Sequence, residues 1–168
     1  MSFFLLFRLL SITMPVVRLR AMSTAYLQTL FEMQLDEEAN QMAVTIPRTL
    51  ENFQRHWEES LVDPNVFARA ILLDEYFVGI VSCFPSEGVT QIGYWLDKPV
   101  WGKGIATQAV LLLLGEVRIR PIWAKLAASN IASRRVLDKC GFQFQYEHVS
   151  PATLRYPECL EVVMRLDR

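Results

Sequence analysis

The sequence predicts a single α/β domain with a mixed, mostly antiparallel sheet of six to seven strands and about four helices. The length of 168 residues suits one domain with a sizeable core. Short apolar or alternating runs indicate strands on both sides of a central helix. Residues 92–96 read as a strand that passes through a tight glycine loop into that helix. The next strand is then expected to lie parallel to 92–96 through a crossover connection.

The first half of the chain predicts one strand and two helices. Residues 16–20 read as the strand, and Thr24 is the expected N-cap of a helix that ends near Met33. A second helix is predicted over 49–61, with Asp63-Pro64-Asn65 as its stop. The helically spaced aromatic residues are expected to face the core; they are Phe31, Phe53 and Trp57.

A β-hairpin is predicted next, from the apolar runs 66–73 and 76–84. The helix after the glycine loop is apolar on nearly every side, which predicts that it is buried all round. Residues 121–128 read as the strand that follows it.

The last part of the chain predicts a helix that starts at Asn130 and closes at Gly141, a good residue for a left-handed helix end. Clean alternation over 142–146 predicts a strand with one buried face. Residues 148–157 are expected to form a loop, and 160–166 the last strand.

Composition excludes several classes of protein. Hydrophobic residues make up 52% and charged residues 21% of the chain, which excludes a disordered protein. The net charge of −1 gives no broad basic face, so nucleic acid is not an expected partner. Three cysteines without a CxxC spacing favour a reduced, cytoplasmic setting, and two distant histidines argue against a metal centre.

Residues 1–14 form an apolar stretch interrupted by Arg8. It is too short and too interrupted to span a bilayer, and it lacks the features of a secretory signal. We expect an N-terminal extension, with the folded domain over 15–168 and no membrane partner. The alternative is a short strand or helix that packs on the domain or on a partner.

The glycine loop is the strongest functional signal. Gly102 and Gly104 lie where a strand meets a helix, and the N–H groups of a helix N-terminus attract a phosphate or pyrophosphate. The spacing fits neither the P-loop nor the dinucleotide fingerprint, so a phosphate-bearing ligand other than ATP or NAD is favoured. The alternative is a packing turn, in which the glycines only allow close contact between strand and helix.

Two motifs resemble those of the GNAT acetyltransferase superfamily. Residues 101–107 resemble its acyl-CoA pyrophosphate loop, Gln/Arg-x-x-Gly-x-Gly/Ala: Gly104 and Ala106 match, and Trp101 stands at the Gln/Arg position. Asn130-Ile131-Ala132-Ser133 and the later Lys139-Cys140-Gly141-Phe142 are similar to the Asn-x-x-Ser helix and Lys-x-Gly-Phe ending of the ribosomal-protein N-terminal acetyltransferase branch. The resemblance covers roughly residue 16 to the C-terminus.

The resemblance implies a GNAT fold with a splayed parallel strand pair at its centre, and acetyl-CoA as co-substrate without a metal. It also implies a site. Ser133 is the implied proton donor to the departing thiolate, with a solvated helix position as the alternative. Asn130 would contact the pantetheine arm and can also cap its helix. The implied cofactor-binding residues are Trp95, Leu96, Trp101, Gly102, Lys103, Gly104, Ile105, Ala106, Thr107 and Asn130.

The general base is not evident from the sequence. Candidates are His56, Glu58, Glu59, Gln91 and Tyr94. An α-amino group, with a pKa near 8, is about one-tenth neutral at pH 7, whereas a lysine amine is almost wholly charged. A site without a strong base therefore favours an α-amine, such as a protein or peptide N-terminus, as the acceptor.

Other functions stay open at this point. The acceptor could be a small amine, such as an amino acid, a polyamine or an antibiotic, although no acidic cluster favours a polycation. The chain could also be a non-catalytic module that binds acyl-CoA, or a nucleotide-binding α/β protein of another kind. A homodimer is the candidate assembly.

Overall fold

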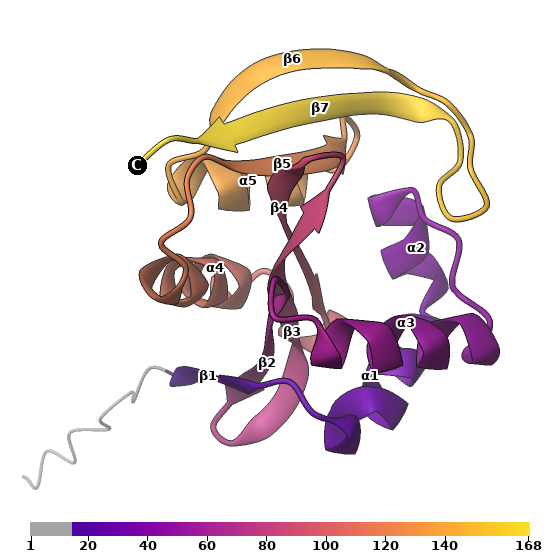
Figure 1. The fold of residues 1–168 in the computed structure, drawn as a ribbon, viewed down its shortest axis with the longest axis vertical. Coiled ribbons are helices and arrows are strands. Elements are labelled where there is room, and N and C mark those ends of the chain that lie inside the picture. The colour runs from indigo at the N-terminus through magenta and orange to yellow at the C-terminus, as the bar shows by residue number, and fades with distance from the viewer. Residues whose placement is uncertain (1–14) are drawn as a thin grey trace, which may run out of the picture.

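A computed structural model describes residues 15–168 as one α/β domain (Figure 1). The expectation for residues 1–14 lies outside the described residues. Within 15–168, no helix combines the length and the apolar character that crossing a membrane requires.

Seven strands form one sheet in the order β1-β2-β3-β4-β5-β7-β6. Neighbouring strands are antiparallel except β4 and β5, which are parallel, as the sequence predicts. The sheet twists, so that β5, β6 and β7 run across the direction of β3 and β4 (Figure 1). The strands are β1 Val17–Ala21, β2 Phe67–Leu73, β3 Tyr76–Ser86, β4 Val89–Leu96, β5 Ile122–Ala127, β6 Gln143–Ser150 and β7 Cys159–Leu166.

Helices cover both faces of the sheet. The helices α4 and α5 pack on one face, and α1, α2 and α3 lie on the other side of β3 and β4 (Figure 1). Short 3-10 turns precede α1 (η1, Thr24–Tyr26) and follow β4 (η2, Lys98–Val100). The α-helices are α1 Leu27–Met33, α2 Glu37–Ala43, α3 Leu50–Val62, α4 Ile105–Glu116 and α5 Ile131–Lys139.

Each face of the sheet has its own hydrophobic core. The larger core joins α4 and α5 to the sheet, and Ile105, Val110 and Leu113 of α4 are fully buried in it. The smaller core contains Phe53 and Trp57, with Phe31 packed against it, so the predicted core role of these aromatic residues is confirmed. Two helical layers thereby hold the middle strands from both sides.

The N-terminal half differs from the prediction in two places. The structure contains α2, which the sequence analysis does not predict because the segment lacks a clear apolar stripe. Its start is instead marked by Asp36, whose side chain accepts a hydrogen bond from the Ala39 N–H at 2.8 Å. Thr24 is not an N-cap: Ser23 precedes η1, and no side chain caps that turn.

Two predictions of burial are wrong. The helix α4 is not buried all round, since Leu111 and Leu112 are 50% and 44% exposed on the side that faces away from the sheet. The strand β6 does not have a buried face: it is an edge strand with exposed residues from Gln143 to Val149. The buried aromatic residue is Phe142, just before the strand. The strand also runs on to Ser150, which shortens the predicted loop.

The two faces of α4 give a matched test of the fold. We expect Leu113→Ala, which empties a fully buried position, to lower the free energy of unfolding by about 2–5 kcal/mol. We expect Leu111→Ala, at a half-exposed position on the same helix, to lower it by less than about 1 kcal/mol. Urea denaturation of the two variants measures both values, and equal losses would contradict the observed orientation of α4.

Candidate functional site

The parallel strands β4 and β5 pair over only two positions. Thr90 lies opposite Ile122 and Gln91 opposite Trp123, and no pairing follows although both strands continue. Beyond this point β4 stays paired with β3 and β5 with β7. The two strands therefore splay apart, and each presents an unpaired backbone edge to the gap.

The direction of the backbone groups on β4 follows from its pairing with β3. The Asp97 N–H donates to the Val78 carbonyl oxygen at 2.8 Å, so Asp97 faces β3. Backbone direction alternates along an antiparallel ladder, so Trp95 also faces β3, while Tyr94 and Leu96 face the gap. Consistently, a Cβ on Gly79 of β3 would lie 2.2 Å from the Trp95 carbonyl oxygen.

The indole of Trp101 fixes the glycine loop to the end of β4. Its Nε1–H donates to the Leu96 carbonyl oxygen at 3.0 Å. The Leu96 N–H is left facing the gap. Trp95, one residue earlier, points its side chain to the other face of the sheet, where its Nε1–H donates to the Met33 carbonyl oxygen at 3.3 Å.

The glycines of the loop have left-handed backbone conformations, with φ of 73° at Gly102 and 75° at Gly104. A Cβ at either position would meet no atom within 4 Å, so close packing is not the reason for these glycines, and the packing alternative is wrong. Gly104 is the N-cap of α4, and no side chain from the described part of the chain, residues 15–168, caps this helix. The N–H groups of its first turn are therefore available to an anion.

A cleft of about 410 Å³ joins the splayed strand to this helix end. Lys103 does not line it, because its ammonium group donates to the Pro99 carbonyl oxygen at 3.0 Å. All the other predicted site residues do, and tertiary structure brings them together: Trp95, Leu96, Trp101, Gly102, Gly104, Ile105, Ala106, Thr107, Asn130 and Ser133.

Asn130 and Ser133 occupy the first turn of α5. Asn130 is buried, and its side-chain oxygen accepts a hydrogen bond from the Ser133 N–H at 3.1 Å, which makes it the N-cap. The capping role that the sequence suggests for Asn130 is confirmed. Both residues face the cleft across from β4.

The cleft also has walls that the sequence analysis missed. Arg135 and Lys139, one turn apart on α5, line it beside the glycine loop and supply positive charge. The sequence does carry a signal for them, because their i, i+4 spacing puts both on one face of the helix that is predicted to start at Asn130. The opposite wall comes from α2, whose side chains here are Ala39, Met42 and Ala43.

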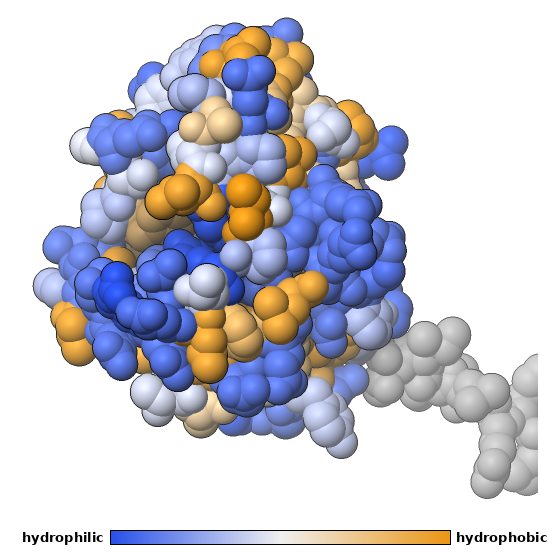
Figure 2. Space-filling model, turned by 90° about the vertical axis from the view of Figure 1, so that its right-hand side faces the viewer, coloured by the Kyte–Doolittle hydropathy of each residue, from blue (hydrophilic) through white to orange (hydrophobic). Residues whose placement is uncertain are grey.

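A second cavity, of about 420 Å³, lies against the other side of β4. It is bounded by α3, β3 and β4, with Arg48 and Tyr156 contributed by loops. Figure 2 views the side of the molecule that carries α2 and α3, where hydrophilic side chains line a hollow with hydrophobic ones around it. Tyr94 and Trp95 line both the cleft and the second cavity, so the two spaces meet at these residues.

The Tyr94 side chain lies on the α4–α5 side of the sheet and makes a contact across the gap. Its hydroxyl donates to the Ser133 carbonyl oxygen at 3.3 Å. Burial raises the pKa of Tyr94 to about 12, so the phenol keeps its proton at neutral pH. From the sequence alone Tyr94 is only a candidate base, because its proximity to α5 depends on tertiary structure.

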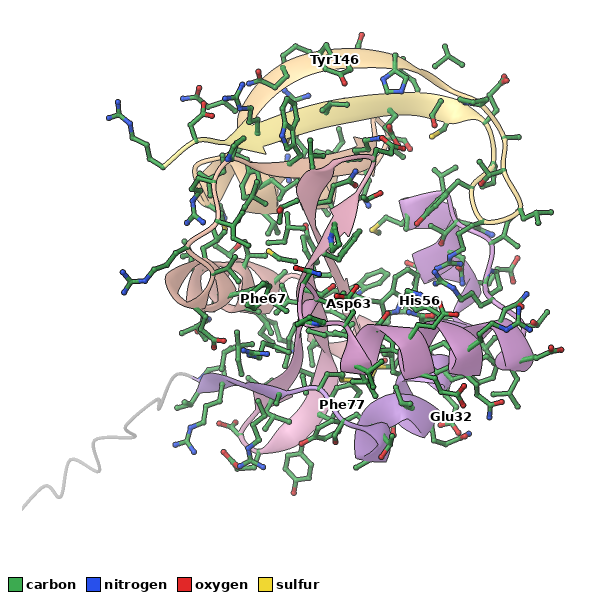
Figure 3. The ribbon with its side chains drawn as sticks, viewed as in Figure 1. Glu32, His56, Asp63, Phe67, Phe77 and Tyr146 are labelled. Carbon is green, nitrogen blue, oxygen red and sulfur yellow. The ribbon has the colours of Figure 1, made fainter. Side chains whose placement is uncertain are left out.

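The predicted bases separate in the structure. His56 and Glu59 line the second cavity, and Glu58 does not. His56 belongs to α3 and lies on the side of this helix that faces α2 (Figure 3). Burial and then the charges of Arg48 and Arg155 lower the pKa of His56 to about 4, so its imidazole is neutral at pH 7. Gln91 is buried, and its Nε2 group has no hydrogen-bond partner in residues 15–168.

The described part of the chain holds no group of three His, Cys, Asp or Glu side chains close enough to bind a metal ion. The groups that the cleft does present are backbone hydrogen-bonding groups, a helix N-terminus and two hydroxyl groups, from Tyr94 and Ser133.

Comparison with known proteins agrees with this geometry. A profile of the acetyltransferase (GNAT) domain family matches residues 17–143. The relative "Probable N-acetyltransferase YjcK" of Bacillus subtilis (strain 168) is 42% identical over 77 residues, which are 41% of this chain and 42% of the relative. The matched part thus spans less than half of that relative.

Solved structures share the fold across most of the chain. The ribosomal L7/L12 alpha-N-protein acetyltransferase RimL, in complex with coenzyme A, superimposes with a TM-score of 0.74 at 20% identity, covering 90% of this chain and 93% of RimL. The spermidine N-acetyltransferase of Vibrio cholerae, in complex with CoA and spermine, gives a TM-score of 0.77 at 13% identity, covering 90% and 95%.

The environment of His56 predicts a pH dependence of stability. Because its pKa is lower in the folded protein than in the unfolded chain, the unfolded chain binds more protons between pH 6.5 and 4. We expect the stabilisation associated with neutral His56 to be complete above pH 6.5 and to be lost as the pH falls toward 4. Urea denaturation across this pH range should show a smaller decrease in the free energy of unfolding for His56→Gln than for the parent protein.

His148→Gln, which changes the histidine on the exposed strand β6, is the control for that experiment. A parallel pH dependence in the parent protein and in His56→Gln would contradict the buried, cationic surroundings of His56.

Proposed function

Because the chain belongs to the GNAT acetyltransferase family, we propose that it transfers an acetyl group from acetyl-CoA to a primary amine, the α-amino group of a protein or peptide N-terminus. The observation that carries this proposal is the cleft in which the open edge of β4 meets the uncapped N-terminus of α4. In acetyl-CoA, the pantetheine arm is an extended chain with amide groups, which suits the open β4 edge, and it ends in a pyrophosphate, which suits the α4 N-terminus.

The pyrophosphate and the pantetheine arm of acetyl-CoA each have proposed partners. The backbone N–H groups from Gly102 to Thr107 bind the pyrophosphate, aided by the positive charges of Arg135 and Lys139. The free backbone groups of Tyr94 on the open edge of β4 hydrogen-bond the pantetheine amides, and Asn130 contacts the same arm. Trp95 contributes only as part of the cleft wall, because its backbone groups face β3 and not the gap.

The acceptor enters from the second cavity and meets the thioester beside Tyr94. The amine nitrogen attacks the thioester carbonyl carbon, the C–N bond forms, and the C–S bond breaks. The Leu96 N–H polarises the carbonyl oxygen, and the CoA thiolate takes up a proton from a nearby hydroxyl group. The amine loses one proton to a base or to water.

Two hydroxyl groups are proposed as the proton donor. Ser133 lines the cleft one turn into α5, as the family motif implies. Tyr94 is the second candidate, and the observation in its favour is that it lies at the junction of the cleft and the second cavity with its proton retained. The Tyr94 phenol lies on the α4–α5 side of the sheet beside Ser133, so it would reach the thiolate from the cleft.

The weakness of the available base favours an α-amine as the acceptor. Neutral His56 can accept a proton, but burial beside two cations makes it a weak base. A weak base suffices for an amine that is already partly neutral at pH 7, such as an α-amino group. The likeness to RimL agrees with such an acceptor, and the likeness to the spermidine enzyme supports a small amine as the second candidate.

Acetyl-CoA binding tests the cofactor site directly. We expect Gly104→Val to abolish calorimetrically detectable binding of acetyl-CoA, because a branched side chain would occupy the space above the α4 N-terminus. The matched control is Gly88→Val in the turn between β3 and β4, where φ is 79° and the surroundings are equally open. Unchanged binding in Gly104→Val would remove the glycine loop from the proposed site.

Replacement of each hydroxyl group tests the proton donor. We expect Tyr94→Phe to lower kcat by about 100-fold or more while the KM for acetyl-CoA stays within about twofold, because general acid catalysis contributes on that scale. Ser133→Ala should lower kcat by a smaller factor. The reverse order in steady-state assays would assign the proton to Ser133. Acetyl-CoA binding without turnover of any amine would instead indicate a non-catalytic module.

A further inference from the structure

Two arginine side chains meet at one end of the second cavity. Arg48 lies just before α3 and lines the cavity, and Arg155 comes from the loop between β6 and β7. The two segments are tied together: the Ile46 N–H donates to the Arg155 carbonyl oxygen at 2.8 Å, and the Arg155 guanidinium donates to the Ile46 carbonyl oxygen. The arginine pair is thus held in place by the fold.

Neither arginine has an acidic partner among residues 15–168, where the ion pairs involve other side chains. Arg155 lies over the ring of Tyr156 at 5.8 Å, a neutral partner, and its buried Nε group has no hydrogen-bond partner. Burial lowers the pKa of both guanidinium groups, and the charge of Arg48 lowers that of Arg155 further. The two partly desolvated positive charges therefore repel each other, and among residues 15–168 only Tyr156 and the Ile46 carbonyl oxygen offset this, with no carboxylate paired to either arginine.

The acidic side chains of the cavity lie farther along α3. Glu59 is one turn from His56, and Asp63 is about 10 Å away along the helix axis. Asp63 is also engaged, since it accepts hydrogen bonds from the backbone and side chain of Asn65 at 2.8 and 3.0 Å. The charges that act on His56 are those of the two arginines, so this end of the cavity is cationic.

We propose that Arg48, with Arg155 behind it, binds a carboxylate of the acceptor, so that the preferred substrate is an amine with a carboxylate close to it. A guanidinium group that lines the cavity can bind a carboxylate through two parallel hydrogen bonds, and the bound anion offsets the repulsion between the arginines. The acceptor amine then lies toward Tyr94, where the cavity meets the cleft. This proposal rests on the proposed function, because it concerns the acceptor of that reaction.

The carboxylate has two sources, which matched acceptors distinguish. One is an acidic side chain in the first two residues of a peptide, and the other is the α-carboxylate of a free amino acid. The test compares the peptides Ser-Asp-Ala-Ala-amide and Ser-Asn-Ala-Ala-amide, which differ only in the charge, together with serine and serine amide. If the carboxylate comes from a peptide side chain, we expect kcat/KM to be about 10- to 100-fold higher for Ser-Asp-Ala-Ala-amide than for Ser-Asn-Ala-Ala-amide. If it is the α-carboxylate of a free amino acid, we expect the same ratio of serine to serine amide.

Variants of the arginines connect that preference to the structure. Arg48→Gln should remove the preference for the charged acceptor, and Arg155→Gln should reduce it less, because Arg155 does not line the cavity. Arg55→Gln is the control, since Arg55 lies next to His56 on α3 but pairs with Glu51 on the surface. Arg48→Glu should invert the preference, so that Ser-Lys-Ala-Ala-amide becomes better than Ser-Asp-Ala-Ala-amide, a gain that misfolding cannot produce.

Equal kcat/KM values for charged and neutral acceptors, or a preference that survives Arg48→Gln, would overturn the proposal. Calorimetric binding of the same acceptors to the protein with CoA keeps the test independent of turnover. If no acceptor is acetylated, the proposed function fails. In that case, tighter binding of the charged than of the neutral acceptors, lost in Arg48→Gln, would still support the carboxylate site. Equal binding of charged and neutral acceptors would overturn it.

Discussion

The incomplete pairing of β4 with β5 is the constraint on which the rest of the site depends. Two pairs of residues hold the strands together at Thr90 and Gln91, and beyond them each strand is supported only from its outer side. An open backbone edge in the middle of a sheet leaves N–H and C=O groups without partners, which is costly unless a ligand or water satisfies them. The same opening lets Tyr94 reach across to α5 and creates the cleft that ends at the α4 N-terminus.

The cleft and the second cavity are electrostatically different because different elements supply their charges. On the cofactor side, Arg135 and Lys139 accompany a helix end that has no capping side chain, an arrangement suited to phosphates. On the other side, burial and then the charges of a fixed pair of arginines lower the pKa of His56. A neutral imidazole and an unpaired guanidinium in one cavity suit an acceptor that is itself polar: a weakly basic amine at one end and an anion at the other.

Local signals made much of this structure predictable. Strand runs, the strand–loop–helix transition and the cap at Asn130 depend on neighbours within a few residues, and the structure has them. Burial depends on which element covers which face, and there prediction failed: within residues 15–168 no element covers β6, and α4 meets the sheet along one side only. The helix α2 was missed because its start signal, Asp36, stands before a largely polar segment.

The sequence by itself determined the order of elements, the glycine loop, the Asn130–Ser133 motif and the family likeness, because these depend on residue types at short spacing. Only the tertiary structure decided the meeting of Tyr94 with Ser133 and of Arg48 with Arg155, which lie 39 and 107 residues apart along the chain. It also decided which backbone groups of β4 face the gap, because that direction follows from the register with β3. Charge, proton affinity and access at the site arise from contacts between distant segments, and no local pattern encodes them.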